Sequence, residues 1–262
     1  MNVLIVGGAG YIGSHFAKHM ARIGHASVVL DNLCSGHRDA VRYGPFLEGN
    51  AGDASLLHAL FDTHNIEAVI HFASHIQVGE SMCDPAKYYA NNVATTLRLL
   101  DAMRHSGIRH FVFSSSAAVY GVPRTAPIRE QHPLDPINPY GRSKRLAEDA
   151  LLELGRTRGA VVDLFRLTNV FGKWSRPNYN SVVATFCHNI ARSIPVTVND
   201  PSSPLRLVYI DDVITAFCAP LLAPDLPGGG RHAGPEFETT VGELAERIGA
   251  FHRSRDTLLT EP

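Results

Sequence analysis

A glycine-rich turn directly after a short apolar run constrains the fold of this chain more than any other feature of its sequence. The run is Val3–Val6, and the turn carries glycines at positions 7, 8, 10 and 13. Glycines allow a strand to turn sharply into a helix and let the backbone approach a pyrophosphate closely. The N-terminus of such a helix presents free N–H groups and the positive end of the helix dipole to phosphates. The pattern predicts a dinucleotide cradle, with either Gly7 or Gly8 as its first glycine, followed by Gly10 and Gly13.

An acidic residue follows the turn at the distance that ribose binding requires. A second apolar run, 27–30, ends in Asp31, roughly 20 residues after Gly13. A carboxylate at this place binds the adenosine ribose hydroxyls and repels a 2′-phosphate, which favours NAD over NADP. Arg38 could reverse this preference, because a nearby arginine accommodates a 2′-phosphate. Strand, glycines, helix, strand and acid in this order favour dinucleotide binding over an ordinary tight turn.

Short apolar runs alternate with segments of helical periodicity along most of the chain. The runs cover 3–6, 27–30, 68–73, 110–114 and 161–167, and the helical periodicity covers 11–24, 54–64, 84–105 and 139–157. Strands this apolar are buried on both faces, which implies a parallel sheet covered by helices. The sequence therefore predicts an α/β fold with a doubly wound (Rossmann) parallel sheet, whose ligands bind at the carboxyl ends of the strands.

The alternation loosens after residue 171. Beyond it we expect a helix over 182–192, short strands over 196–198 and 205–209, and helices that begin at Asp212 and Val241. This organisation predicts an NAD-binding Rossmann domain over residues 1–170. It also predicts a small C-terminal substrate-binding lobe over 171–262 that is interleaved with the end of the sheet.

The composition argues against several classes of function. The chain has 262 residues, 45% of them hydrophobic and 19% charged, and a net charge of −1, so we expect neither nucleic acid nor a membrane as a partner. Its four cysteines form no Cys-x-x-Cys pair and its 14 histidines show no metal-ligand spacing, which predicts reduced thiols and no metal site. No apolar stretch reaches membrane-spanning length, and the first apolar run begins at once, so we expect no signal peptide and a cytoplasmic location.

A second motif predicts proton transfer. The segment Asn-Pro-Tyr at 138–140 is typical of a helix start, and Tyr140 and Lys144 then share one helix face. The lysine ammonium and a positively charged nicotinamide would lower the pKa of the tyrosine from about 10, and the lysine could hydrogen-bond the nicotinamide ribose. Ser116, chosen from the serines at 114–116, would bind the same substrate oxygen. Alone, Tyr-x-x-x-Lys is more typical of a surface helix pair, but together with a dinucleotide cradle it indicates catalysis.

The loop between these motifs, 121–139, carries prolines at 123, 127, 133, 136 and 139. Proline restricts the backbone, so the loop is expected to be stiff. It could form one wall of a substrate pocket or a rigid surface connector.

At these residues the chain resembles an extended short-chain dehydrogenase/reductase, and residues 1–155 resemble the UDP-glucose/UDP-galactose 4-epimerase family. The resemblance is carried by Gly-Gly-Ala-Gly-Tyr-Ile-Gly-Ser-His at 7–15, Asp-Asn-Leu at 31–33, His-Phe-Ala at 71–73, Val-Gly-Glu-Ser at 78–81, Tyr-Tyr-Ala-Asn-Asn-Val at 88–93, Phe-Ser-Ser-Ser-Ala-Ala-Val-Tyr-Gly at 113–121 and Asn-Pro-Tyr-Gly-Arg-Ser-Lys at 138–144. It implies interconversion of UDP-hexoses at C4 through a 4-keto sugar, with NAD as the hydride acceptor and donor.

The resemblance also implies roles for single residues. Asp31 and Asn32 would hold the adenosine ribose, Asp53 would face the adenine, and Ala73 and Asn91 would lie along the cofactor. The full expected NAD-binding set is Gly7, Gly10, Tyr11, Ile12, Gly13, Asp31, Asn32, Asp53, Phe72, Ala73, Asn91, Ser114, Tyr140 and Lys144. The expected catalytic residues are Ser116, Tyr140 and Lys144, and the expected substrate contacts are Ser116, Asn169, Asn180 and Arg206. A homodimer that packs 84–105 and 139–157 of each copy is implied as well.

Three of the substrate contacts depend on position in the chain. Asn169 is expected to reach the nucleotide-sugar, and Arg206 is a candidate partner of the pyrophosphate. Asn180, together with Arg176 and Asn178, could line the same pocket or could be ordinary loop polarity.

The second half of the chain departs from the 4-epimerase pattern. Residues 163–262, above all 169–189 and 207–213, resemble the reductase domain of capsule-biosynthesis enzymes that act on UDP-linked 4-keto deoxy-sugars and carry a further cupin domain. Ile76 stands where some epimerases have a lysine that contacts the cofactor, and the chain is shorter than a full 4-epimerase. A natural mosaic, a diverged family member and an engineered or truncated chain are all compatible with this pattern.

Two other functions therefore stand beside the 4-epimerase. One is an NAD(P)H-dependent UDP-4-keto-sugar reductase of polysaccharide biosynthesis, and the other is a non-catalytic dinucleotide-binding sensor. The sensor is disfavoured because such proteins typically lose the tyrosine or the lysine. A dehydratase is disfavoured because Ala117 and Ala118 stand where an acid pair is needed.

Overall fold

The computed structural model describes residues 1–122, 130, 132–223 and 227–257. Over these residues the chain forms two compact units. The first comprises Met1–Leu167 and Ile214–Ala233, and the second comprises Thr168–Val213 and the residues from Gly234 onward. The chain thus leaves the first unit after Leu167 and returns to it at Ile214. The assignment of NAD binding to residues 1–170 and of substrate binding to 171–262 remains a prediction.

The first unit contains a seven-stranded sheet in which every neighbouring pair of strands is parallel. Its strand order is β3 (Phe46–Glu48), β2 (Ala26–Asp31), β1 (Asn2–Val6), β4 (Ala68–His71), β5 (His110–Ser116), β6 (Val161–Leu167) and β9 (Gly229–Arg231). The central strands are buried on both faces, as their continuous apolar sequences require. The predicted doubly wound parallel sheet is confirmed. The order reverses between β1 and β4, and in such sheets this switch point is where ligands bind.

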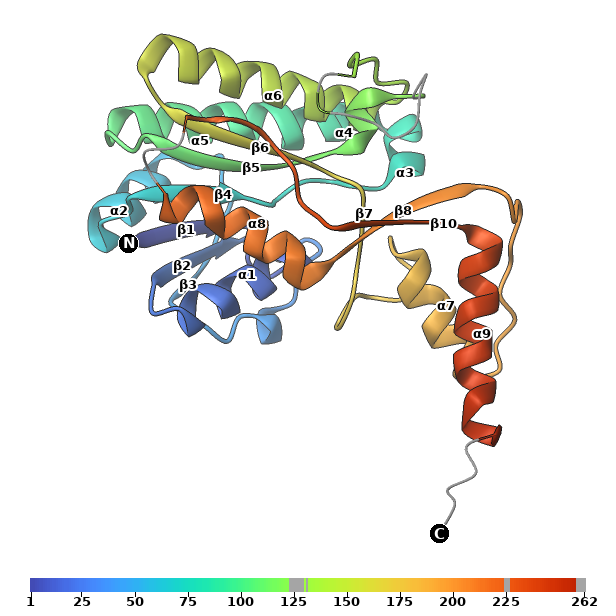
Figure 1. Cartoon of the computed structure of the whole chain (residues 1–262). Coiled ribbons are helices and arrows are strands. Elements are labelled where there is room, and N and C mark those ends of the chain that lie inside the picture. Colours follow the sequence, from blue (N-terminus) through green and yellow to red (C-terminus); the bar gives the residue numbers. More distant parts are fainter. Residues whose placement is uncertain (123–129, 131, 224–226, 258–262) are drawn as a thin grey trace. The chain divides into compact units, whose positions relative to one another are not determined.

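Helices cover both faces of this sheet (Figure 1). On one face lie α2 (Ala54–His64), α5 (Thr95–His105) and α6 (Pro139–Arg158), which pack against one another and share a large apolar core with the strands. On the other face lie α1 (Tyr11–Arg22) and the part of α8 (Ile210–Leu222) that belongs to the first unit. There Phe72 forms ring contacts with Phe16 and Phe217, and Phe217 in turn with Phe165. The α5 and α6 layer is the one that reaches the predicted catalytic residues.

The segment 84–105, expected to be one helix, has three parts. A short helix α4 (Pro85–Tyr88) is followed by a π-helical turn η2 (Tyr89–Ala94) and then by α5. Within η2, Asn92 is buried, and its side chain hydrogen-bonds the backbone of His75 and the hydroxyl of Ser143. Such turns are rare and occur frequently at functional sites.

Other differences from the sequence-based expectation concern short elements. The structure adds the helix α3 (Val78–Cys83), the 3₁₀ turns η1 (Arg38–Ala40) and η3 (Ala117–Tyr120), and the strands β3, β7 (Asn169–Phe171), β9 and β10 (Glu236–Thr240). Residues 196–198 form no strand, because Val196 and Val198 instead pack their side chains against the core of the second unit. The helix expected from Asp212 begins at Ile210.

The second unit is built on a three-stranded sheet with the order β10, β8 (Pro204–Tyr209) and β7. The helices α7 (Val182–Ile190) and α9 (Val241–Thr257) contact each other. Phe186, Leu207 and Leu244 form the buried centre of this unit.

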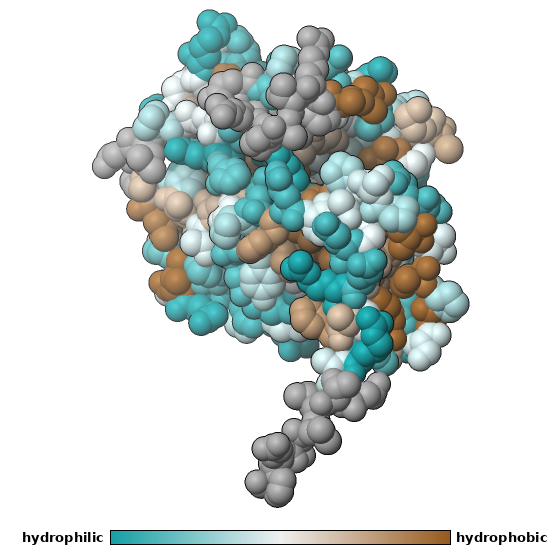
Figure 2. Space-filling model, turned by 45° about the vertical axis from the view of Figure 1, so that its right-hand side comes forward, coloured by the Kyte–Doolittle hydropathy of each residue, from teal (hydrophilic) through white to brown (hydrophobic). Residues whose placement is uncertain are grey.

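None of the helices in the described part of the chain is long and apolar enough to span a membrane. On the face shown in Figure 2, hydrophobic side chains gather in several separate patches with hydrophilic ones between them. Hydrophobic atoms normally make up a large share of a protein surface, so scattered patches of this kind need no special explanation.

Candidate active site

The glycine turn is crowded in a way that explains its sequence. Gly7 has a φ of +83°, and a Cβ there would lie 2.6 Å from the backbone nitrogen of Ala73. A Cβ on Gly13 would lie 2.3 Å from the carbonyl oxygen of Gly7, and one on Gly8 would lie 2.7 Å from a methyl of Val29. At Gly10, the N-cap of α1, the nearest atom would be 3.3 Å away. The packing of the turn thus requires glycine at 7, 8 and 13. The contact at Gly10 is tight as well, so all four glycines suit the close packing at the helix end that attracts phosphates.

Asp31 joins the end of β2 to this turn. Its Oδ2 accepts a hydrogen bond from the backbone nitrogen of Ala9 at 2.9 Å, and its Oδ1 accepts one from Leu33 at 2.9 Å. Each carboxylate oxygen keeps a second lone pair for a ribose hydroxyl. Arg38, the residue that could favour NADP, lies over the ring of Phe46 and donates to the Val41 carbonyl.

The ends of β1 and β4 meet beside the glycine turn. The backbone nitrogens of Phe72 and Ala73 both donate to the carbonyl of Val6, at 2.8 and 3.2 Å. Ala73 thereby lies against Gly7, as the NAD-binding prediction requires. The ring of Phe72, in contrast, packs among Phe16 and Phe217 in the apolar layer, so its backbone is the part that borders the turn.

Four other predicted cofactor residues have internal contacts. Asp53 caps α2 by accepting from the Leu56 nitrogen at 3.1 Å. Asn32 accepts from Cys34, and Asn91 donates to the buried Asn92. The phenol oxygen of Tyr11 is buried, and its backbone carbonyl accepts from Ser14. Their role toward NAD remains a prediction.

The predicted catalytic helix begins as expected. Asn138 caps α6 by accepting from the Gly141 nitrogen at 2.8 Å, with Pro139 in the first turn. Tyr140 and Lys144 are both buried, 8% and 2% exposed, at the face that packs on β5. The Nζ atom of Lys144 donates to Ser74 Oγ at 2.7 Å and to the carbonyl of Ser114 at 2.8 Å. The cap and the packing of α6 therefore place both side chains at the carboxyl end of β5.

Burial dominates the protonation of this pair. It lowers the pKa of the Lys144 amine to about 7, against an opposing effect of the Glu148 carboxylate. It raises the pKa of the Tyr140 phenol, against an opposing hydrogen bond with Ser116. We expected the lysine to lower the pKa of the tyrosine. In this structure the loss of water around the phenol outweighs such an effect.

The three serines at the end of β5 have three different partners. The carbonyl of Ser114 binds Lys144, and the hydroxyl of Ser115 donates to Glu148. The hydroxyl of Ser116 accepts a hydrogen bond from the Ala118 nitrogen at 3.2 Å and lies near enough to Tyr140 to lower the pKa of the phenol against burial. This geometry supports the choice of Ser116 as the serine that shares a substrate oxygen with the tyrosine.

A glycine cradle, an acid at the end of β2 and a buried Ser-Tyr-Lys cluster together agree with one known family. Residues 3–233 match the model of the NAD dependent epimerase/dehydratase family. The chain belongs to this family.

Individual relatives are similar to the chain over different lengths. A UDP-glucose 4-epimerase of Rhizobium leguminosarum bv. trifolii is 44% identical over 188 residues, which are 69% of this chain and 58% of that protein. A UDP-2-acetamido-2,6-beta-L-arabino-hexul-4-ose reductase of Pseudomonas aeruginosa is 35% identical over 261 residues, 99% of this chain and 60% of that protein. The chain thus spans less than two thirds of the length of these relatives.

A solved structure shows the same fold. The UDP-glucose 4-epimerase of Thermus thermophilus, in complex with NAD, superposes with a TM-score of 0.89 at 31% identity. The match covers 96% of this chain and 83% of that one.

Of the substrate residues predicted for this epimerase/dehydratase chain, Ser116 lies in the first unit, and Asn169, Asn180 and Arg206 lie in the second. Asn169 donates to the carbonyl of Arg206 at 3.1 Å. The guanidinium of Arg206 pairs with Glu238 at 2.8 Å and lies 3.8 Å from Glu236. Asn180 is exposed. Sequence reasoning missed the two carboxylates, although alternating Glu at 236 and 238 on a strand could have indicated them.

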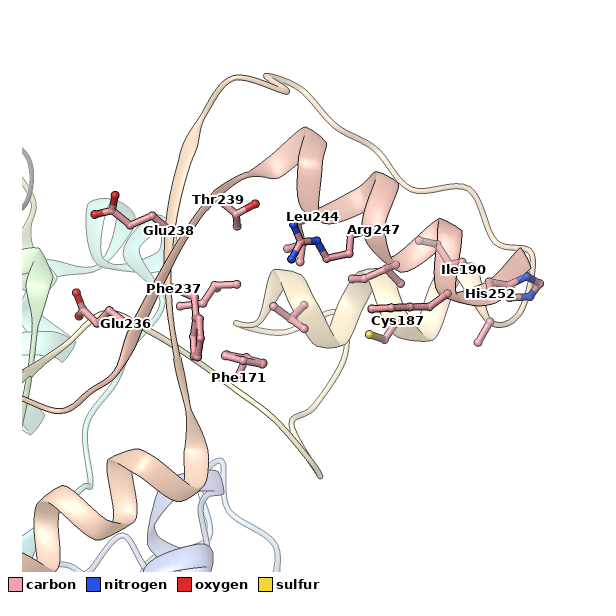
Figure 3. Close-up of a pocket in the computed structure, with 15 residues that line it drawn as sticks. Phe171, Cys187, Ile190, Glu236, Phe237, Glu238, Thr239, Leu244, Arg247 and His252 are labelled. Carbon is pink, nitrogen blue, oxygen red and sulfur yellow. The ribbon is translucent and has the colours of Figure 1, made fainter. Parts of the chain in front are cut away.

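The second unit also contains a cavity of about 790 Å³ between α7, α9 and the strands. Phe171, Ile190, Phe237 and Leu244 are among the side chains that line it (Figure 3). The lining is mainly apolar and includes none of the predicted catalytic or NAD-binding residues. The residues predicted for catalysis and NAD binding therefore lie outside this cavity.

Some important residues gave no sequence signal. Asn92, Glu148 and Arg166 are polar side chains that form buried or largely buried hydrogen bonds within the first unit. Asn92 stands next to the predicted Asn91, and Glu148 lies one helical turn after Lys144.

The described residues include no group of three or more His, Cys, Asp or Glu side chains that could hold a metal ion.

Proposed function

We propose that this chain is an NAD-dependent nucleotide-sugar epimerase that interconverts UDP-hexoses at C4 through a 4-keto intermediate. The observation that carries the proposal is the buried contact of Ser116 with Tyr140 beside the amine of Lys144, at the same edge of the sheet as the glycine turn. Relatives named UDP-glucose 4-epimerase, in sequence and in structure, support the substrate class.

The residues at the switch point fit a dinucleotide. The tight turn that Gly7 and Gly13 make possible leads into the N-terminus of α1, where a pyrophosphate is expected, and Asp31 is held where a ribose is expected. NAD bound there would supply the hydride acceptor and donor for C4 of the sugar. The carboxylate of Asp31 and the engagement of Arg38 with Phe46 favour NAD over NADP.

The protein contributes positioning and proton transfer. Tyr140 takes the proton of the sugar 4-hydroxyl. After the 4-keto sugar has rotated so that the other face of C4 is presented for hydride return, Tyr140 gives the proton back to the 4-keto oxygen. Ser116 hydrogen-bonds the same oxygen and so aligns it with the phenol. The amine of Lys144, with a pKa of about 7, can carry a positive charge near neutral pH and favour the phenolate.

The proposed UDP-sugar contacts are Ser116, Asn169, Asn180 and Arg206. Arg206 is charged and only 16% exposed, and its pairing with Glu238 holds the guanidinium in place. If it binds a pyrophosphate, the phosphates compete with Glu238 for the same donors.

A specific observation favours a second candidate, a UDP-4-keto-sugar reductase that uses NAD(P)H. The Pseudomonas aeruginosa reductase matches 99% of the chain, whereas the rhizobial 4-epimerase matches 69%. In this reaction Tyr140 would donate a proton to the keto oxygen, so the same three residues would serve. The direction of net hydride transfer separates the two candidates.

We further propose a cytoplasmic homodimer without nucleic-acid or membrane partners. The apolar side chains of Leu97 on α5 and of Leu146 and Leu152 on α6 are 43–48% exposed. Such side chains suit burial against the same helices of a second copy.

Proton NMR of the anomeric signals tests the function. Purified protein with NAD and UDP-galactose should produce UDP-glucose without net change in NAD. If no conversion occurs but NADH is consumed with a UDP-4-keto-sugar, the reductase replaces the epimerase. A chain that binds NAD and converts neither would support the sensor.

A further inference from the structure

A buried carboxylate lies one helical turn after Lys144. Glu148 follows Lys144 by four residues and Tyr140 by eight, so the three side chains share one face of α6. Glu148 is 0% exposed. A carboxylate without water is costly unless it is paired and hydrogen-bonded, so its partners need an explanation.

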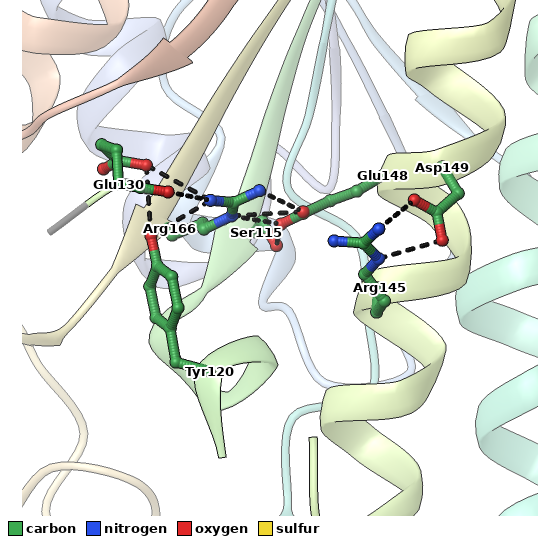
Figure 4. A network of polar contacts seen from close by, with 7 residues as sticks. All are labelled: Ser115, Tyr120, Glu130, Arg145, Glu148, Asp149 and Arg166. Atoms are coloured by element: carbon green, nitrogen blue, oxygen red, sulfur yellow. Dashed lines mark hydrogen bonds and ion pairs between the residues drawn. The ribbon is translucent and has the colours of Figure 1, made fainter. Parts of the chain in front are cut away.

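Two strands supply these partners (Figure 4). Arg166 of β6 binds Glu148 in a fork, from Nη2 to Oε2 at 2.8 Å and from Nε to Oε1 at 3.1 Å. Ser115 of β5 donates its hydroxyl to the same Oε1. Planar pairs of this kind fix orientation as well as distance. Glu148 therefore ties α6 to both β5 and β6.

The proposed catalytic residues lie on α6 and β5, two of these three elements. Three successive residues of β5 contact α6. The carbonyl of Ser114 accepts a hydrogen bond from Lys144, the hydroxyl of Ser115 donates one to Glu148, and Ser116 lies against Tyr140. A shift of α6 along β5 would break all three contacts together. We propose that Glu148, held by Arg166 and Ser115, is a positioning residue that keeps Tyr140 and Lys144 in place at the end of β5. This inference rests on the proposed function for its catalytic meaning.

Arg166 extends the network toward the proline-bearing loop. Its Nη1 donates to the hydroxyl of Tyr120 at 3.1 Å and to the carbonyl of Glu130 at 3.2 Å. Part of the loop, including Pro123 and Pro127, lies outside the described residues. At Glu130, however, the loop and the catalytic helix share one guanidinium. A change at Glu148 should therefore alter the positions of both the loop at Glu130 and the catalytic helix.

Charge provides a second link between Glu148 and the site. The titratable groups that face the Lys144 amine are Glu148 and Tyr140 on α6 and His71 on β4. Burial and the nearby amine lower the pKa of His71 to about 3, so this ring is neutral at neutral pH. The Glu148 carboxylate is thus the charge that raises the pKa of Lys144 against burial.

The test is the variant Glu148→Gln, which keeps the shape and removes the charge. The chain has only four lysines, at 18, 87, 144 and 173, so NMR of lysine labelled with ¹³C at Cε can follow Lys144 through a pH titration. We expect the titration midpoint of Lys144 to fall by about 1 pH unit. We expect kcat for UDP-galactose to fall about 10- to 100-fold.

Asp149→Asn is the matched control. Asp149 is the next residue on α6 and pairs with Arg145 at 2.8 Å, but this pair is partly exposed (Figure 4). Its loss makes the same charge change on the same helix, and we expect the Lys144 midpoint and kcat to stay at wild-type values. Equal effects of the two variants on Lys144 would overturn the proposal.

A second variant covers the case in which Glu148→Gln does not fold, since Arg166 would lose its buried partner. The double replacement Glu148→Met with Arg166→Met removes both charges, a change that buried pairs often tolerate. A folded double variant with a wild-type kcat for UDP-galactose would contradict the proposal. The NMR titration of Lys144 needs no turnover. A wild-type chain that fails to epimerise would overturn the proposed function, but the titration would still test the link between Glu148 and Lys144.

Discussion

At the residue scale, the chemistry of this chain depends on how burial treats a few polar groups. The amine of Lys144 ordinarily has a pKa of 10.5, and burial brings this value to about 7. The same loss of water raises the pKa of Tyr140. The two shifts have one cause, because each group loses the water that would stabilise its charged form.

The first prediction at this scale concerns the phenol itself. Tyr140→Phe removes the proton acceptor but keeps the ring that contacts Tyr88. We expect kcat to fall by at least about 100-fold, because a general base typically contributes 10²–10⁴. NAD binding, measured by calorimetry, should persist. Tyr43→Phe, at a tyrosine without a proposed role, should leave turnover unchanged; retained turnover in Tyr140→Phe would refute the assigned base.

The second prediction concerns the glycine turn. Alanine within a helix ordinarily stabilises relative to glycine by about 0.5–1 kcal/mol. At Gly13 the added Cβ would meet the backbone oxygen of Gly7 at 2.3 Å, so Gly13→Ala should destabilise by about 1–3 kcal/mol and weaken NAD binding at least about tenfold. Gly79→Ala in α3, where nothing lies within 4 Å, is the control and should stabilise by about 0.5–1 kcal/mol in chemical denaturation. A stabilised Gly13→Ala would show that the turn has room.

The third prediction concerns pH. Burial keeps His71 neutral, with a folded pKa of about 3 against 6.5 for the model imidazole. Between these values the unfolded chain binds more protons, so the free energy of unfolding should fall as pH drops from 6.5 toward 3, by up to about 1.4 kcal/mol per pH unit from this group. His71→Gln should flatten that fall in urea denaturation, whereas His252→Gln, at an exposed position, should not. An unchanged slope in His71→Gln would contradict the assignment.

At the element scale, the long parts of the fold follow directly from the sequence and the short parts do not. Strands such as β5 and helices such as α6 repeat a buried pattern over enough residues to be recognised. β9, with the sequence Gly-Gly-Arg, has no apolar pattern and forms a strand because β6 offers it a free edge. The pairing of β9 with β6 depends on the folded sheet, so the local sequence of β9 does not predict it.

Helix caps can be predicted from sequence and tested at this scale. Asn138→Ala removes the cap of α6, which should cost about 1 kcal/mol and loosen the turn that carries Tyr140. We expect kcat to fall about tenfold in a steady-state assay. Thr240→Ala, which removes a cap of α9 in the second unit, should cost similar stability without that loss of kcat. Equal kcat in the two variants would mean that the cap does not position the tyrosine.

Polar networks mark the limit of sequence reasoning at the site. The cradle, Asp31, Tyr140 and Lys144 were predictable because their chemistry fixes their spacing in the chain. The pairing of Glu148 with Arg166 joins a helix to a strand 18 positions later, and no spacing rule specifies such a contact. Arg206 was predicted as a candidate partner of the pyrophosphate, but the strand β10 that carries its partner Glu238 was itself not predicted.

At the scale of the whole molecule, the chain combines a complete parallel sheet with a small second unit. The sheet carries the glycine turn, the acid and the Ser-Tyr-Lys cluster on neighbouring strands. The second unit carries three of the four proposed UDP-sugar contacts, Asn169, Asn180 and Arg206. The chain covers about three fifths of the length of these two relatives, the rhizobial 4-epimerase and the Pseudomonas aeruginosa reductase. The proposed function therefore requires that this length suffices for turnover.

The most direct measurement of the central claim uses UDP-galactose with deuterium at C4. An epimerase that works through a 4-keto sugar returns the same hydrogen to the other face of C4, while Tyr140 exchanges only the hydroxyl proton with water. The account predicts UDP-glucose that retains deuterium at C4 in the NMR spectrum. UDP-glucose with a proton from water at C4, or no UDP-glucose at all, would contradict it.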